Sequence, residues 1–175
     1  TMPPRKGKYV IGGWMMDVRI AILDESMIDA AAPLVIGYLH SSPDGMTQAK
    51  PAKKQYQELL GRIKRNLSEL LKSGLASIYV AQVGREIAAY ILLSWGFSIG
   101  KGRPVLRVDA LYTLPEYRNR GIGRKLMEFA VDMAESNHAA RMQLETDDCN
   151  APAQTLYTNI GFERIEGKEV FMKFL

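Results

Sequence analysis

Hydrophobic and polar residues repeat with a period of about two in some stretches and about 3.6 in others, which predicts both strands and helices. Residues 17–23 alternate apolar and polar side chains, as a strand with one buried face does. Two helical patterns follow. The first is interrupted by Pro33, which would kink or delay it, and the second covers residues 53–72 and stops at Gly74.

Strand patterns dominate the middle of the chain. Residues 77–83 and 86–95 are two apolar runs joined by a turn at Gly84, which predicts a hairpin. Residues 105–114 form a run rich in valine, leucine and tyrosine that stops at Pro115. Such a run is typical of a buried strand.

The C-terminal part combines helices with short strands. The helix predicted from Ile122 onward has apolar residues on one face and charged residues on the other. The remaining predicted elements are a strand over 141–146, a helix over 151–160 that ends at Gly161, and closing strands over 162–165 and 170–174. This order predicts an α/β (α+β) fold, with a central mixed, mostly antiparallel sheet of about seven strands and helices on both faces.

The length suits a single domain. A chain of 175 residues is long enough for one core and short for two. Thr1 precedes Met2, so we expect residues 1–15 to be an N-terminal extension or the remnant of a cleaved expression product, and residues 16–175 to form the domain. Hydrophobic residues at 47% and charged residues at 24% are ordinary globular values, which excludes disordered and collagen-like chains.

The net charge of +4 is concentrated near the N-terminus, because Arg5, Lys6 and Lys8 have no acidic neighbour in the first fifteen residues. The rest of the chain is nearly neutral, which argues against a broad nucleic-acid-binding face. A nucleic-acid-directed protein stays an alternative through a second basic group, although a solvated helix face explains the same charges. That group consists of Lys50, Lys53, Lys54, Arg62, Lys64 and Arg65.

Cysteine and histidine are too rare for a disulfide framework or a metal cluster. Cys149 is the single cysteine, and His40 and His138 are the two histidines. No apolar run approaches the length needed to cross a membrane. We therefore expect a cytoplasmic protein without a metal and without a membrane partner.

The stretch Arg118-Asn119-Arg120-Gly121-Ile122-Gly123-Arg124-Lys125 joins the buried strand to the amphipathic helix, so its glycines fall at a helix N-terminus. There the first backbone N–H groups lack helical partners and the dipole is positive, which favours an anion. Glycine lets that anion approach the backbone, and the basic side chains add charge. A phosphate-binding site is predicted. A Walker loop is excluded because Leu126 replaces its Ser/Thr, and the dinucleotide fingerprint because Leu126 replaces its third glycine.

A second candidate segment covers residues 150–162. Asn150 suits a helix N-cap, and Ala153 and Tyr157 share one face of the helix that follows. Tyr157 would then point toward the sheet, where its phenol can donate a proton. A core tyrosine with a satisfied hydroxyl is the alternative interpretation.

The two segments together resemble the GNAT family of N-acetyltransferases. The first carries the motif Arg-x-x-Gly-x-Gly after a strand, at residues 118–123, and the second carries Asn150, Tyr157 and Gly161-Phe162. The resemblance implies transfer of an acetyl group from acetyl-coenzyme A to a primary amine, by direct attack in a ternary complex and without an acyl-enzyme. In that family the strand before the glycines splays from the next strand, and the cofactor arm enters the gap.

Carried onto this chain, the resemblance implies roles for three groups of residues. The backbone of Leu111, Tyr112 and Thr113 would contact the arm of the cofactor, residues 118–125 would hold its pyrophosphate, and Asn150, Ala153 and Tyr157 would also contact it. The backbone N–H of Leu111 would polarise the thioester carbonyl, and Tyr157 would protonate the leaving thiolate.

Several carboxylates, or water, could accept the proton of the attacking amine. Asp109 is the first candidate, because strand alternation would put it on the same face as Leu111, with Ala110 on the other face. Glu145 is a rival, as are Asp147 and Asp148. Each of these carboxylates can instead attract a cationic substrate.

The acceptor and the assembly are also open. In this family the acceptor pocket is built by segments that correspond to residues 38–46 and 95–103, and these match no acceptor signature. A small-molecule amine and a peptide or protein amine both fit, and a homodimer is one option for the assembly. A non-catalytic acyl-coenzyme A-binding module is the alternative from another class, and an acylated Cys149 is an alternative mechanism.

Overall fold

The computed structural model describes residues 6–11, 14–41, 51–167 and 169–173. Within these residues six strands form one sheet in the same order in space as in the chain. The strands are β1 (Lys6–Ile11), β2 (Trp14–Ile22), β3 (Ala76–Val83), β4 (Glu86–Ser98), β5 (Arg103–Thr113) and β6 (Arg141–Leu144). Neighbours from β1 to β5 are antiparallel and β5 with β6 is parallel, so the predicted mixed, mostly antiparallel sheet is confirmed.

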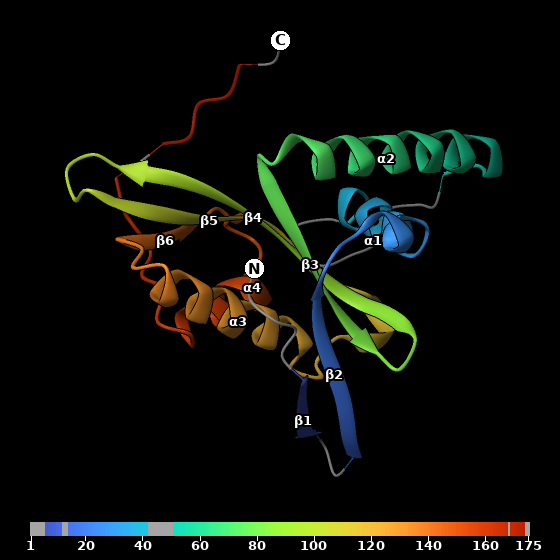
Figure 1. Cartoon of the computed structure of the whole chain (residues 1–175), viewed down its shortest axis with the longest axis horizontal. Coiled ribbons are helices and arrows are strands. Elements are labelled where there is room, and N and C mark those ends of the chain that lie inside the picture. Colours follow the sequence, from blue (N-terminus) through green and yellow to red (C-terminus); the bar gives the residue numbers. More distant parts are fainter. Residues whose placement is uncertain (1–5, 12–13, 42–50, 168, 174–175) are drawn as a thin grey trace.

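Helices cover both faces of this sheet, as predicted (Figure 1). The four helices of the described chain are α1 (Ile28–Leu39), α2 (Lys53–Ser73), α3 (Ile122–Ser136) and α4 (Ala151–Thr158). Two short 3-10 turns, Glu25–Met27 and Pro115–Tyr117, precede α1 and the glycine-rich segment. Pro33 is accommodated inside α1, and Gly74 ends α2 in the left-handed conformation, with φ of 65°.

Each face of the sheet has its own hydrophobic core. On one face, Leu126 and Ala130 of α3 pack with Leu106 of β5. On the other face, Ala32 of α1 and Ile63 of α2 pack with strand residues from β2 to β5. The sheet is thus a central layer whose middle strands, β4 and β5, are buried on both sides.

The ends of the chain differ from the prediction. The closing strands expected over 162–165 and 170–174 are wrong, since the described part of these ranges forms no strand, and Phe171 is 87% exposed. Residue 174 lies outside the described residues. The predicted N-terminal extension instead contributes β1, which pairs with β2. Gly12-Gly13 in the sequence between these strands is a hairpin signal that points to such a pairing.

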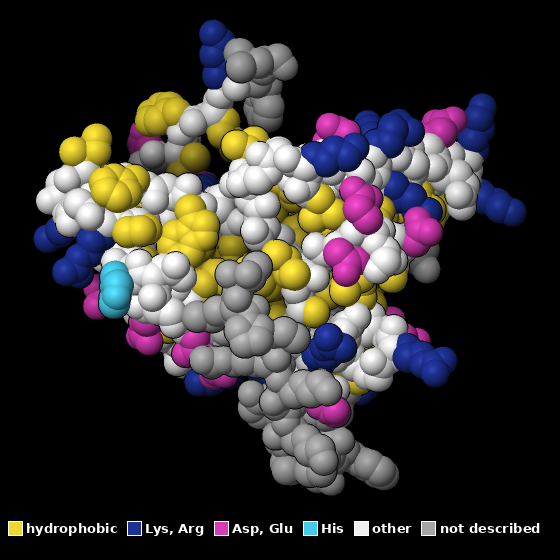
Figure 2. All heavy atoms as spheres, in the orientation of Figure 1, with side chains coloured by type: hydrophobic (Ala, Val, Ile, Leu, Met, Phe, Trp, Pro, Cys, Tyr) yellow, Lys and Arg dark blue, Asp and Glu magenta, His cyan; other side chains and the backbone are white. Residues whose placement is uncertain are grey.

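The end of the β4–β5 hairpin and the surface of α1 and α2 expose different kinds of side chain. Apolar side chains gather at the free end of the β4–β5 hairpin, where Trp95, Phe97 and Ile99 are 44%, 64% and 91% exposed (Figure 2). Basic and acidic side chains are interspersed along α1 and α2 in the same view (Figure 2). Lys64 of α2 pairs with Asp29 of α1 at 2.7 Å, so this surface is not of a single sign.

Candidate active site

A fork between β5 and β6 forms the centre of the candidate site. The parallel pairing of these strands ends at Val108 with Leu144, whereas β5 continues to Thr113 with β4 as its partner. Beyond residue 108, therefore, no strand among the described residues pairs with the β6 side of β5, which leaves an open edge there. This agrees with the splayed strands that the sequence resemblance implies.

The backbone direction along β5 determines which groups face the open edge. The N–H of Leu114 donates to Ala88 O at 2.9 Å, toward β4. Because backbone groups alternate along an antiparallel strand, the N–H and C=O of Leu111 and Thr113 point away from β4, into the fork. The backbone of Tyr112 points toward β4 and its ring is 8% exposed, so Tyr112 is not placed with them.

A β-bulge at Asp109 changes which side chains share a face. Val108 pairs with Leu93 and Ala110 pairs with Leu92, so Asp109 is an extra residue without a partner on β4. Ala110 packs in the α1–α2 core, whereas Leu111 packs against the α3 core. The prediction from simple alternation is therefore wrong: Asp109 is the extra residue of the bulge and interrupts the alternation, so it does not share the face of Leu111.

The glycine-rich segment forms the N-terminus of α3, as predicted. Gly121 is the N-cap with φ of 70°, a left-handed conformation that favours glycine, and Asn119 also has a positive φ, of 57°. Ile122 anchors the helix start in the core at 1% exposure. No acidic residue lies in the first turn, so the unpaired N–H groups and the helix dipole favour an anion there.

The four basic residues of this segment have different environments. Arg118 donates from Nε to Thr113 O at 3.1 Å, and Arg120 lies 5.6 Å from the centre of the Tyr117 ring. Arg124 pairs with Glu128 at 2.8 Å. The ammonium of Lys125 is buried, and burial lowers its pKa, with an opposing contribution from Glu128. Arg118 is thus the cation that a hydrogen bond holds at the open edge of β5, and Arg120 lies over Tyr117 just before the helix start.

One pocket of about 330 Å³ lies at the fork and contains all four predicted catalytic candidates. Its lining includes Asp109 and Leu111 of β5, Glu145 just after β6, and Tyr157 of α4. Asn150 also lines it and caps α4, because its Oδ1 accepts from the Ala153 N–H at 3.3 Å. The pocket therefore combines a phenol, carboxylates and an open strand edge.

Part of the expected acceptor segment reaches this pocket. Tyr38, Leu39 and Ser41 line it, whereas residues 42–46 lie outside the described residues. The other expected segment, 95–103, is absent from its lining. The rings of Tyr38 and Tyr112 are 6.5 Å apart, and the guanidinium of Arg118 lies 5.6 Å from the centre of the Tyr112 ring, so aromatic contacts connect the pocket to the glycine-rich segment.

The two pocket tyrosines are held as neutral phenols. Burial raises the pKa of Tyr157, with a smaller contribution from Tyr38. Burial also raises the pKa of Tyr38, followed by the charges of Asp147 and Asp109. The Tyr157 hydroxyl makes no hydrogen bond with the described residues, and its ring packs 6.1 Å from that of Phe162. This phenol is therefore available as a proton donor.

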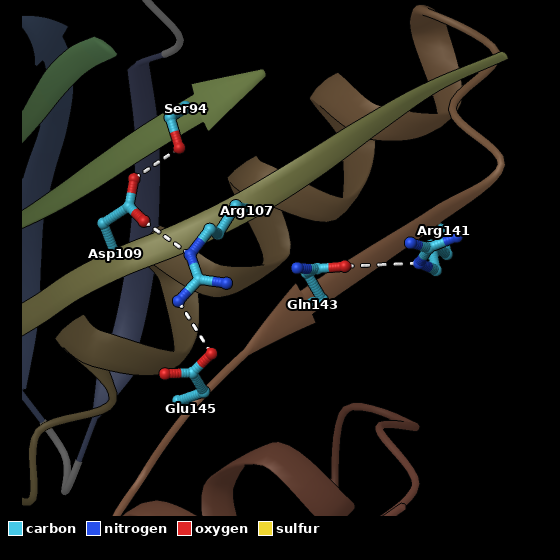
Figure 3. A network of polar contacts seen from close by, with 6 residues as sticks. All are labelled: Ser94, Arg107, Asp109, Arg141, Gln143 and Glu145. Carbon is cyan, nitrogen blue, oxygen red and sulfur yellow. Dashed lines mark hydrogen bonds and ion pairs between the residues drawn. The ribbon is translucent and has the colours of Figure 1, made fainter. Parts of the chain in front are cut away.

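A polar network beside the pocket connects β4, β5 and the residue that follows β6 (Figure 3). Ser94 Oγ donates to Asp109 Oδ2 at 2.5 Å, and Arg107 Nε donates to Asp109 Oδ1 at 2.8 Å. Arg107 Nη2 donates to Glu145 Oε1 at 2.9 Å. The hydrogen bond to Glu145 is the largest cause of the raised pKa of Arg107. Sequence reasoning missed Ser94 and Arg107. For Arg107 there was a signal, because it is a charged residue inside the apolar run of β5.

Metal chemistry and a membrane span have no support in the part of the chain that the structure describes. No group of three or more His, Cys, Asp or Glu side chains there could hold a metal ion. Of the helices described, none has the length and apolar character required to cross a bilayer.

Comparison with protein families gives a match over most of the chain. The model of the acetyltransferase (GNAT) family matches residues 42–162. An N-alpha-acetyltransferase of Sulfurisphaera tokodaii is 35% identical over 105 residues, which are 56% of this chain and 63% of the relative. A thialysine N-epsilon-acetyltransferase of Bos taurus is 30% identical over 86 residues, which are 49% of this chain and 50% of the relative. The chain thus spans between half and two thirds of the length of these relatives.

Solved structures share the fold over nearly the whole chain. A probable acetyltransferase superposes with a TM-score of 0.71 at 23% identity, covering 90% of this chain and 97% of that one. A ribosomal-protein-alanine N-acetyltransferase from Brucella melitensis gives a TM-score of 0.69 at 19% identity, covering 90% and 99%. At these identities the likeness concerns the fold.

Proposed function

The chain belongs to the acetyltransferase (GNAT) family, and we propose that it transfers an acetyl group from acetyl-coenzyme A to a primary amine. One observation carries the proposal: Gly123 at the start of α3 lies beside Thr113 and Leu111, and the phenol of Tyr157 shares a pocket with Leu111, so both adjoin one strand edge. An anion site, a backbone edge and a proton donor are the three features that an acyl-coenzyme A thioester requires.

The residues at the fork fit acetyl-coenzyme A. A Cβ at Gly123 would point toward Thr113 and Leu156, with nearest approaches of 3.5 and 3.9 Å, so glycine keeps the space between β5 and α4 open. We assign the pyrophosphate to the helix start at Gly121, with Arg118 and Arg120 adding positive charge. Backbone groups of Leu111 and Thr113 would pair with the amides of the cofactor arm, although Thr113 O already accepts from Arg118.

The remaining candidates support this assignment to different degrees. Asn150 lines the pocket at the start of α4, and its cap on the Ala153 N–H fixes that helix end; Ala153 stays a proposed cofactor contact that is not part of the pocket lining. Arg124 and Lys125 would act through their charge, because one is paired with Glu128 and the other has a buried ammonium.

The proposed chemistry is direct attack of a neutral amine on the thioester that acetyl-coenzyme A supplies when bound. The backbone N–H of Leu111 stabilises negative charge that develops on the carbonyl oxygen. A carboxylate of Asp109 or Glu145, or a water that one of them holds, accepts the proton of the amine. Tyr157 gives its phenolic proton to the departing sulfur as the carbon–sulfur bond breaks.

The acceptor is a cationic amine before it reacts, and the pocket suits it. Asp109, Glu145 and Asp147 line the pocket and would attract an ammonium group. A small-molecule amine and the amine of a peptide or protein both remain within the proposal. The names of the two relatives, an N-alpha-acetyltransferase and a thialysine N-epsilon-acetyltransferase, cover both kinds of acceptor. A cytoplasmic location is part of the same proposal, and a homodimer stays one option for the assembly.

Two other functions are less well supported. A non-catalytic acyl-coenzyme A-binding module needs the helix start but not the alignment of Tyr157, Asp109 and Glu145 in one pocket. A nucleic-acid-directed role would use the predicted second basic group, of which Lys50 lies outside the described residues and Lys64 pairs with Asp29.

Titration with acetyl-coenzyme A, followed by a screen of amines for release of free thiol, tests the proposal. We expect saturable binding and thiol release that requires an amine. Binding with no amine-dependent release would favour the non-catalytic module, and absence of binding would remove the proposed function.

A further inference from the structure

Arg107 lies in the paired part of β5 just before the fork opens, and it is not among the residues that line the pocket. It lies opposite Gln143 in the β5–β6 register, one pair before the pairing ends. Its guanidinium reaches the Asp109 carboxylate on β5 at 2.8 Å and the Glu145 carboxylate beyond β6 at 2.9 Å (Figure 3). One cation thus joins carboxylates from both branches of the fork.

The charged and titratable groups that face the pocket come from several elements. The carboxylates of Asp109, Glu145 and Asp147 line it, and Arg107 compensates two of them. Tyr38 of α1 and Tyr157 of α4 also line it, and burial raises the pKa of both, so they stay neutral. Without Arg107, three carboxylates would act on a bound ammonium with no cation hydrogen-bonded to them.

We propose that Arg107 is a positioning residue that limits the negative charge of the acceptor pocket, so that a cationic amine is attracted and can still release its proton. This inference rests on the proposed acetyl transfer. The amine must lose a proton before its lone pair can attack, and that proton goes to a pocket carboxylate or to water. Uncompensated carboxylates would hold the ammonium form too firmly for this step.

The size of the effect follows from the electrostatics of a half-exposed site. The side chains of Arg107, Asp109 and Glu145 are 36%, 27% and 52% exposed, so solvent screens their charges partly. One added unit of negative charge a few ångströms from the bound ammonium should raise the pH needed for its deprotonation by about one unit. At a fixed neutral pH this corresponds to a kcat about tenfold lower.

The experiment compares Arg107→Gln with two matched variants. Arg107→Lys keeps the positive charge, and Arg141→Gln removes an arginine of the neighbouring strand whose Nε meets Gln143 Oε1 at 3.3 Å. The rate–pH profile and the kcat and KM for the amine are measured with the acceptor that wild type turns over fastest among a short diamine, an amino-acid amide and a tetrapeptide with a free N-terminus. Melting temperatures and acetyl-coenzyme A affinity are measured in parallel.

For Arg107→Gln we expect a kcat about tenfold lower near neutral pH, an amine KM that is equal or lower, and recovery of kcat about one pH unit higher. The difference should shrink in high salt, because the site is partly exposed. Arg107→Lys should restore the profile to within about threefold of wild type, and Arg141→Gln should match wild type.

Several results would overturn the inference. A raised amine KM with unchanged kcat in Arg107→Gln would mean that Arg107 only helps to bind the acceptor, and an equal loss at every pH would mean that it only supports the fold. If Arg107→Gln melts below the assay temperature, a shifted profile in Arg107→Lys would still contradict the role of charge. Failure of the proposed function is distinct, since wild type itself would then release no thiol with any of the amines.

Discussion

Replacing Gly123 with aspartate separates anion binding from folding. Gly123 is the second residue of α3, and a Cβ there would meet Thr113 Oγ1 at 3.5 Å, Leu156 Cδ2 at 3.9 Å and Leu111 Cδ2 at 4.0 Å. These are ordinary van der Waals distances, so the unliganded protein can accept a side chain. Gly121 is less suitable, because its φ of 70° would strain any other residue.

The expected effect on the free protein is neutral or stabilising. A carboxylate in the first turn of a helix stabilises it by about 0.3–1 kcal/mol, and replacing a helical glycine with aspartate adds about 0.3 kcal/mol. In a chain of this size, 1 kcal/mol changes Tm by roughly 2–4 °C. Gly123→Asp without ligand should therefore melt at the wild-type temperature or roughly 1–5 °C above it.

The effect on cofactor binding should be opposite. At 100 times its Kd, acetyl-coenzyme A should stabilise wild type by about 2.7 kcal/mol, or roughly 5–11 °C. Gly123→Asp should lose this shift, since its carboxylate would lie at the helix start beside the phosphates and repel them. Gly123→Ala adds a methyl group without charge and should keep most of the shift.

Differential scanning fluorimetry of the three proteins, with and without acetyl-coenzyme A, measures both effects. An undiminished shift in Gly123→Asp would refute the anion site at the start of α3. A Tm well below wild type in the unliganded variant would refute the packing argument instead.

Three further predictions concern the pocket. Tyr157→Phe should lower kcat by roughly tenfold or more with unchanged cofactor affinity and Tm, because only a proton donor is lost; full turnover in steady-state assays would show that Tyr157 only packs. Because burial raises the pKa of Tyr157 above its ordinary value of 10.0, the phenol stays protonated below that pH, and the rate–pH profile should show no loss of the acid up to about pH 10. Asp109→Asn should raise the amine KM and lower the rate most near neutral pH, with recovery at higher pH; equal losses at all pH values would indicate substrate positioning, and no loss would move the base to Glu145 or water.

Three helix boundaries were predictable because their signals are local. The amphipathic period of α2 and its stop at Gly74 match the observed helix, which ends at Ser73. The glycines after a buried strand predicted the helix start at Ile122, and Asn150 does cap α4. In each of these cases the deciding residues lie within a few positions of one another.

The features that sequence reasoning missed depend on pairing across the sheet. The bulge at Asp109 appears only in the register of β5 against β4, because an extra residue leaves no mark in the apolar pattern. The ion pair between Arg107 and Glu145 joins residues 38 positions apart through the β5–β6 pairing. The prediction of closing strands was wrong for a related reason. Val170 and Phe171 are residue types that favour strands, but no described strand pairs with them.

Whether the pocket at the fork acetylates amines is tested most directly by counting products in one reaction. Acetyl-coenzyme A is mixed with the amine panel and the protein, and free thiol and acetylated amine are quantified together. The account predicts one acetylated amine for each thiol released, with both products reduced about tenfold in Tyr157→Phe. Saturable binding of acetyl-coenzyme A with neither product formed above the rate without protein would contradict it.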